Sequence, residues 1–148
     1  MAVLALMFIS FRSAKMTLLT FVPFVAGAAG MLGLMALFDL EFNFMNIFVG
    51  LMIIGVATDY AIYMLQRYRE DPKTFALAAH ETGKAIVMAA LTAIVGYGSF
   101  AISHYPGLRS IGYASTFGIG LSGLAAITLL PAILVLGKRD EHNSANAR

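Results

Sequence analysis

The sequence predicts an all-α membrane protein: a bundle of five transmembrane helices, the first incomplete, with a short cytoplasmic surface helix. Of its 148 residues, 59% are hydrophobic and 12% are charged, whereas soluble domains average about 45–50% apolar and about 25% charged residues. Four apolar stretches are long enough to cross a bilayer, which takes about 20 helical residues. Basic residues occur at alternate connections between these stretches. These three observations together favour a multi-pass membrane protein.

The predicted spans cover residues 16–38, 46–65, 85–103 and 110–136. A further apolar stretch, residues 2–11, is too short to cross a bilayer and has no polar residues before it. We expect it to be the end of a helix that begins before Met1. Residues 1–137 then form one transmembrane block, and the polar residues 138–148 form a cytoplasmic tail that we expect to be disordered.

The distribution of basic residues predicts the orientation of the bundle. Nine of the ten lie on one side of it: Arg12, Lys15, Arg67, Arg69, Lys73, Lys84, Lys138, Arg139 and Arg148. The other side carries Asp39, Glu41, His104 and Arg109. Because cytoplasmic loops are enriched in Lys and Arg, the sequence predicts a cytoplasmic C-terminus and a location in the cytoplasmic (inner) membrane.

The connection between the third and fourth predicted spans has a helical pattern. Asp71 and Pro72 suit the N-cap and first position of a helix. Apolar or small residues then recur at helical spacing from Phe75 to Thr82. An amphipathic surface helix over residues 72–83 fits this pattern, and a solvated helical loop fits it equally well.

Small residues recur on several predicted helices. Stripes of them are formed by Ala85, Ala89 and Ala93, by Gly27, Gly30 and Gly33, and by Gly112, Thr116 and Gly120. Because helices in lipid associate through close packing of small residues, these stripes predict a tight bundle.

The spans contain one carboxylate, Asp59. An Asp at the centre of a spanning helix costs about 2.5–3.5 kcal/mol and faces the bundle interior or a water-filled cavity in most cases. Gly55 and Tyr63 lie on its helical face, and Tyr60 offers a phenolic donor beside it. A carboxyl group that is neutral when water is excluded and ionised when water reaches it can bind and release a proton. It can therefore relay protons. The alternative is a structural Asp that hydrogen-bonds to Thr92, Tyr97 or Thr116 of neighbouring spans.

Several other functions are disfavoured by the residues present. Proteolysis by paired aspartates needs two carboxylates, and the predicted spans carry one. The sequence has no cysteine, no HExxH motif and only three scattered histidines, so we predict no catalytic residue, metal or cofactor. The formal net charge of +2 is too small and dispersed to indicate nucleic-acid binding.

The stretch "GLMIIGVATDYAIYMLQRYRE" resembles the resistance–nodulation–division (RND) superfamily of exporters, in particular its MMPL-like branch, through the G-x-x-x-D-Y motif from Gly55 to Tyr60. The likeness continues through "DPKTFALAAHETGKAIVMAALTAIVGY" and "LRSIGYASTFGIGLSGLAAITLLPAIL". It implies the C-terminal transmembrane block of a proton-driven exporter of lipids or other hydrophobic molecules. Asp59 and Tyr60 would then form one of two proton-relay pairs.

Family members are built from two homologous halves, so the resemblance also implies a partner: the remaining half of the same transporter or a separate subunit. Membrane lipids and a hydrophobic substrate are the other expected partners. Sterol-sensing domains resemble the same fold, so a non-transporting lipid-binding or sensor scaffold is the alternative function. A third interpretation makes Asp59 a polar contact to a partner polypeptide.

Overall fold

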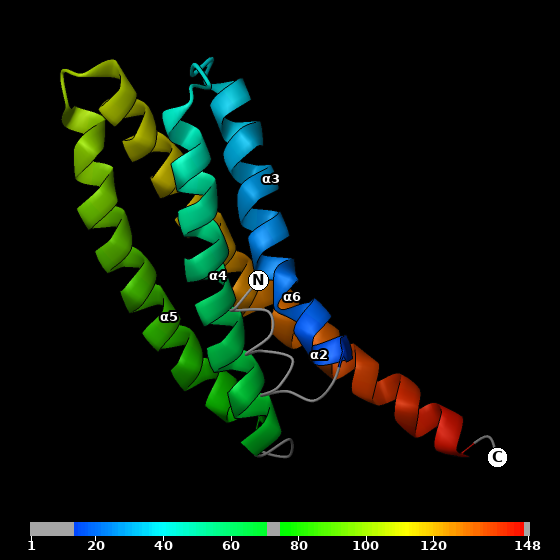
Figure 1. The fold of residues 1–148 in the computed structure, drawn as a ribbon. Helices are drawn as coiled ribbons and strands as arrows, with labels where there is room; N and C mark the ends of the chain where they lie inside the picture. Colours follow the sequence, from blue (N-terminus) through cyan, green and yellow to red (C-terminus); the bar gives the residue numbers. More distant parts are fainter. Residues whose placement is uncertain (1–13, 71–74, 147–148) are drawn as a thin grey trace.

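Helices make up nearly all of the computed structural model, which describes residues 14–70 and 75–146, with side chains for residues 16–70, 75 and 79–135. The elements are α2 (Ala14–Leu19), α3 (Phe21–Leu37), α4 (Met45–Glu70), α5 (Phe75–Gly98), the 3-10 helix η1 (Ser99–Ile102) and α6 (Pro106–Asn146) (Figure 1). Four candidate spans lie within these residues. The all-α membrane bundle is therefore confirmed; the predicted partial span over residues 2–11 lies outside the described residues.

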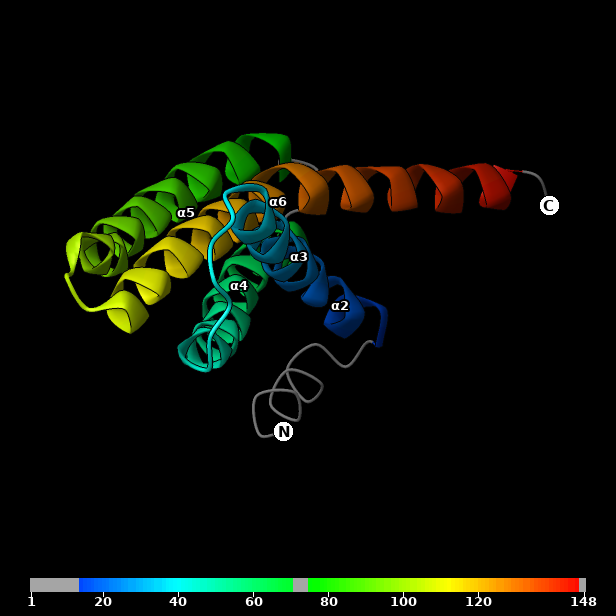
Figure 2. The same cartoon turned by 90° about the horizontal axis from the view of Figure 1, so that it is seen from above.

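Helix α6 is the centre of the bundle and contacts α3, α4 and α5. In Figure 2, which shows the bundle from above, α5 and α3 lie beside α6, and α4 lies lower in the picture. Ile119, Ala126 and Leu130 of α6 are fully buried. We call the end where α4 ends and α5 begins the basic end, and the end with the α3–α4 and η1–α6 connections the outer end.

The contact between α3 and α6 depends on a glycine. A Cβ atom at Gly27 would lie 2.7 Å from the Ser122 Cβ and 2.8 Å from the Gly118 carbonyl oxygen. Both distances are shorter than real Cβ contacts, so only glycine fits. In contrast, Gly33 of the same predicted stripe has no atom within 4 Å of such a Cβ. Gly27, at one end of the stripe, therefore packs against α6, whereas Gly33, at the other end, faces open space.

The first described span is divided into two helices by Pro23. A proline ring clashes with the carbonyl of the residue four positions earlier and lacks the N–H that would bond to it. That residue is Leu19, where α2 ends, and α3 begins at Phe21. The buried Thr20 between them donates its hydroxyl to the Thr17 carbonyl at 2.6 Å.

Helix α3 ends in a Schellman motif at the outer end. The N–H of Leu40 donates to Met35 at 2.9 Å and that of Asp39 to Ala36 at 3.3 Å. Asp39 has a φ of 51°, the left-handed conformation that this motif requires. Asp adopts it more readily than most side chains, so the acidic turn follows directly from the helix end.

The predicted surface helix over residues 72–83 is instead the beginning of a spanning helix, since α5 runs from Phe75 to Gly98 without a break. The apolar face that suggested it packs inside the bundle: Phe75 and Thr82 are buried, and the Phe75 ring lies 5.1 Å from that of Tyr68. Residues 71–74 lie outside the described residues. Gly83 does not end the helix, because a single glycine lowers helix stability by only about 1 kcal/mol.

The C-terminal segment also differs from expectation. The backbone of α6 continues through Pro131 to Asn146, where a disordered tail was expected over residues 138–148. Figures 1 and 2 show this helix extending beyond the others.

The Gly27 contact gives a first prediction. Gly27→Ala should lower the free energy of unfolding by about 1–3 kcal/mol, the cost of overpacking, because both neighbouring atoms belong to or lie next to the α6 backbone. Gly33→Ala, on the same helix, should have no destabilising effect. Thermal unfolding of the purified native protein in detergent measures both; equal midpoints for the two variants would contradict the packing described.

Candidate functional site

Asp59 lies near the middle of α4, as the fifteenth of its 26 residues. It is exposed on the surface of this bundle, so it does not face the interior formed by the described helices; that it faces a water-filled cavity or the interior of a larger assembly stays a prediction. Within the part of the chain that the structure describes, no hydrogen bond or ion pair reaches its carboxylate. At 1.5 Å per residue it is about 16 Å from Glu70 and about 21 Å from Met45, which is membrane depth.

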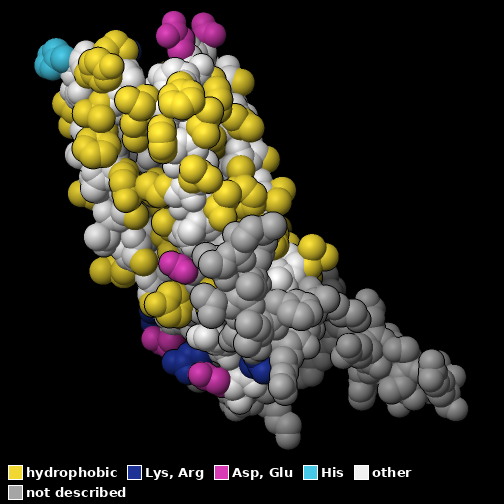
Figure 3. Space-filling view, in the orientation of Figure 1, with side chains coloured by type: hydrophobic (Ala, Val, Ile, Leu, Met, Phe, Trp, Pro, Cys, Tyr) yellow, Lys and Arg dark blue, Asp and Glu magenta, His cyan; other side chains and the backbone are white. Residues whose placement is uncertain are grey.

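The exposed face of α4 that carries Asp59 is a straight stripe with two halves. Its members, spaced three or four residues apart, are all exposed: Phe48, Leu51, Gly55, Asp59, Tyr63, Gln66 and Glu70. The stripe is apolar toward the outer end and polar from Asp59 to the basic end. Hydrophobic side chains dominate this side of the molecule, and most charged ones gather near its two ends (Figure 3).

Tyr60 points into the bundle, unlike its neighbour. It is 5% exposed and belongs to the core cluster that includes Ile86, Ala90 and Ile119. A Cβ atom at Gly123 of α6 would lie 3.7 Å from the Tyr60 ring, so the ring packs over this glycine. The predicted relay pair therefore combines an exposed carboxylate with a buried phenol.

The predicted hydrogen-bond partners of Asp59 do not meet it. The Thr92 hydroxyl donates to the Met88 carbonyl at 2.8 Å, and that of Thr116 donates to Gly112 at 2.9 Å. Tyr97 makes an edge contact with Phe100, with ring centroids 6.4 Å apart. The two threonines satisfy their hydroxyls on their own helix, so the structural interpretation of Asp59 has no support from these residues.

A groove of about 460 Å³ lies between α4 and α5 at the basic end. Tyr60 and Tyr63 line its deeper part, together with Ala85, Ile86 and Ala89 of α5. We call it the α4–α5 groove. Tyr60, the residue next to Asp59, lines the groove, whereas Asp59 does not.

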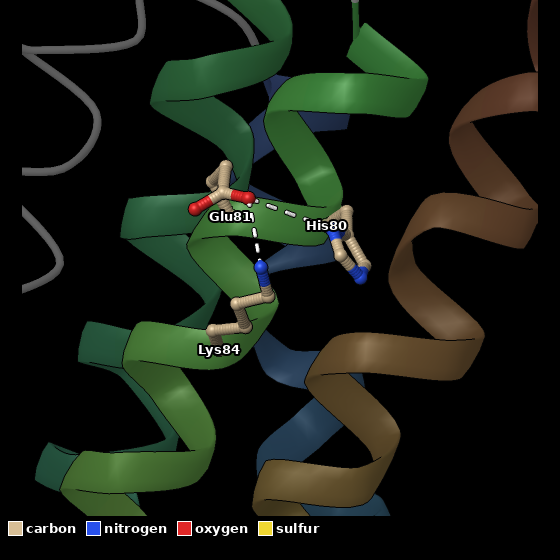
Figure 4. Close-up of polar contacts among 3 residues, drawn as sticks. All are labelled: His80, Glu81 and Lys84. Carbon is tan, nitrogen blue, oxygen red and sulfur yellow. Dashed lines mark hydrogen bonds and ion pairs between the residues drawn. The ribbon is translucent and has the colours of Figure 1, made fainter.

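Two ion pairs flank the mouth of this groove. Arg67 pairs with Glu70 on α4 at 2.9 Å, and Lys84 pairs with Glu81 on α5 at 3.0 Å. The His80 Nδ1 atom lies 3.6 Å from the same Glu81 oxygen (Figure 4). All five side chains are more than half exposed. Pairs this exposed contribute little to stability.

Sequence reasoning missed a buried polar cluster at the outer end. The Ser110 hydroxyl lies 3.0 Å from Asn46 Oδ1 and 3.2 Å from the Glu41 carbonyl, and Asn46 Nδ2 donates to that carbonyl at 3.5 Å. Asn46 is 1% exposed. The sequence feature that could have indicated this cluster is Asn46, an asparagine at the start of an apolar stretch. The cluster joins the α3–α4 connection and the start of α4 to α6.

Comparison with known proteins adds to this geometry. Residues 1–147 match the model of the MMPL family. The chain belongs to the MMPL family. No solved structure matches it.

Three relatives illustrate the membership. The apo-petrobactin exporter of Bacillus anthracis is 32% identical over 58% of this chain and 12% of its own length. The probable transport protein MmpL10 of Mycobacterium leprae is 34% identical over 64% of the chain and 10% of the relative. The heme uptake protein MmpL11 of Mycobacterium tuberculosis is 29% identical over 62% and 10%. The matched segment spans about a tenth of these relatives.

The outer cluster gives a second prediction. Asn46→Ala should reduce the free energy of unfolding by about 1–3 kcal/mol, because it removes the two hydrogen bonds that the buried Asn46 amide makes with the Glu41 carbonyl and the Ser110 hydroxyl. Ser110→Ala should cost less, and adding it to Asn46→Ala should change little, because the two side chains share one set of hydrogen bonds. Thermal unfolding of the two single variants and the double variant measures this coupling. Strictly additive losses would show that the residues act separately.

Proposed function

We propose that this MMPL-family chain is the C-terminal transmembrane block of a proton-driven exporter of lipids or other hydrophobic molecules, with Asp59 and Tyr60 as its proton relay. The observation that carries the proposal is the exposed carboxylate of Asp59 in the middle of α4. A carboxylate at membrane depth is costly. Nothing in the described bundle compensates for it, and a proton-carrying role accounts for it.

The exposed stripe of α4 supports a partner at this face. Lipid contact alone would leave Asp59 in hydrocarbon, whereas a second half of the transporter would bury it among protein groups. Gly55, one turn away, has no atom within 4 Å of a Cβ built on it, so a helix can approach the backbone closely there. The partner is the remaining half of the same transporter or a separate subunit. It supplies any cationic partner of Asp59, because the described spans have no Lys or Arg near it.

Tyr60 connects the relay to the packing of the bundle. The Tyr60 side chain projects from α4 into a core cluster that includes residues of α5 and α6. A change in charge at the adjacent Asp59 therefore acts on a residue that packs against α5 and α6. We infer that protonation and deprotonation of Asp59 alter this packing and so drive the substrate-handling part of the transporter. The basic end faces the cytoplasm in this proposal, as the distribution of Lys and Arg favours.

Substitution of Asp59 tests the proposal. Asp59→Asn should reduce transport by the native full-length protein to the level of empty vesicles, with insertion and abundance unchanged, because the amide cannot carry a proton. Asp39→Asn at the outer end is the matched control and should transport normally. Transport is measured as substrate efflux from proteoliposomes with an imposed proton gradient. Normal transport by the Asp59 variant would refute the relay.

The uncoupler response separates this function from the lipid-binding or sensor scaffold. A proton-driven exporter stops when the gradient collapses. A scaffold retains its lipid binding under the same conditions, and that result would favour the alternative function.

A further inference from the structure

We propose that a groove between α5 and α6 binds a phospholipid with a net negative headgroup, from the leaflet at the basic end of the bundle. An acyl chain of the lipid lies in the groove, and the headgroup phosphate lies at Lys84, with the His80 ring as a second N–H donor. The inference is independent of the transport proposal, because the groove uses neither Asp59 nor Tyr60.

This groove, which we call the α5–α6 groove, has a volume of about 510 Å³. Its α5 wall consists of two rows with a spacing of four residues, the first of Ala79, Gly83 and Val87 and the second of His80, Lys84 and Met88. Ile127 of α6 lies on the other side. From Ala79 to Met88 the wall extends about 14 Å along the helix, so the groove is elongated parallel to the spans.

Gly83 gives the groove its depth. A Cβ atom built on this buried glycine would lie 3.6 Å from the Ile127 Cγ2 atom, which is an ordinary contact. Helix packing therefore does not require a glycine here, in contrast to Gly27. A longer side chain at position 83 would instead occupy the space in front of Ile127.

The groove is apolar along its length and cationic at one end. Its polar lining is confined to Lys84 and His80, and no carboxylate is among the described residues that line it. The second row thus changes from polar to apolar toward Met88, as an amphiphile does from headgroup to chain. Basic pockets between spanning helices bind anionic lipid headgroups, and a lysine near a helix end keeps its ammonium group at the membrane surface.

The nearest carboxylate, that of Glu81, belongs to the other side of α5. It pairs with Lys84 at 3.0 Å but lines the α4–α5 groove. Figure 4 shows His80 on the side of α5 toward α6 and Glu81 on the side toward α4. Because an ion pair this exposed contributes little, the Lys84 ammonium can turn to a phosphate at small cost.

The absence of a carboxylate from the described lining selects the kind of headgroup. The cationic group of a zwitterionic lipid would lie near Lys84 and find no anion in the groove to pair with. A headgroup that carries only negative charge, such as phosphatidylglycerol, meets no such repulsion. The α4–α5 groove is different, because Glu70 and Glu81 line it together with Arg67, so its charges balance and favour no anionic lipid.

Tryptophan quenching by brominated lipids tests the site in the native full-length protein with its other tryptophans replaced by phenylalanine. The vesicles are mostly phosphatidylcholine, with a minor share of brominated phosphatidylglycerol or brominated phosphatidylcholine. For Met88→Trp, the relative binding constant should favour phosphatidylglycerol about fivefold, the factor expected for one cationic side chain at the membrane surface. Met88 is 67% exposed, so it reports on lipid at the groove.

Leu124→Trp is the matched control for position and should show no preference between the two lipids. Leu124 of α6 is 59% exposed and does not line the α5–α6 groove. It follows Gly123, which packs on Ala90, so its depth is close to that of Met88. Equal quenching of Met88→Trp by both lipids would mean bulk lipid in the groove, and weak quenching by either would mean a covering protein segment. Each result would overturn the proposal.

The phosphate contact is tested by variants of Lys84 combined with Met88→Trp. Lys84→Gln should remove the preference for phosphatidylglycerol, and Lys84→Arg should retain it. Arg67→Gln is the matched control for charge and should also retain it. Arg67 forms an exposed ion pair with a glutamate three residues away at the same end of the bundle, as Lys84 does, but it does not line the α5–α6 groove. A preference that survives Lys84→Gln, or that Arg67→Gln removes equally, would overturn the assignment of the headgroup to Lys84.

Discussion

The close approach of α3 to α6 at Gly27 is the constraint on which the arrangement of this bundle depends. In lipid, apolar side chains gain little by leaving the solvent, so packing at short distance supplies much of the association energy. Small residues of α6 also allow α4 and α5 to approach it closely. Ile53 of α4 packs over Gly118, and Ala90 of α5 packs against Gly123. One helix with small residues on several sides therefore positions the other three.

This arrangement also determines which way α4 faces. Its contacts with α6 and α3 use Val49, Ile53, Ala57 and Tyr60, all buried. Asp59 lies on the exposed face of α4, four residues after Gly55 and four before Tyr63, which are exposed too. Its exposure is a consequence of how α4 packs.

The spans could be predicted from the sequence, because apolar length is a local feature, and Asp59 stands out among them as an isolated carboxylate. The direction in which Asp59 points could not be predicted. A helix such as α4 is apolar toward protein and toward lipid alike, so the hydrophobic pattern does not distinguish its faces. The same limit explains the errors over Thr92 and Thr116, whose hydroxyls bond within their own helices. The hydrophobic pattern around Gly83 did not reveal that Phe75 and Thr82 are buried in the bundle.

The central place of α6 has a consequence for biosynthesis. The helix that holds the bundle together is also the last of the described helices to be made. At about 5–20 residues per second, several seconds pass between completion of α3 at Leu37 and the start of α6 at Pro106. During that interval Gly27 has no partner, and α3, α4 and α5 sit in the membrane with few mutual contacts. The nascent chain must be kept from other associations until α6 enters the bilayer and packs against α3, α4 and α5.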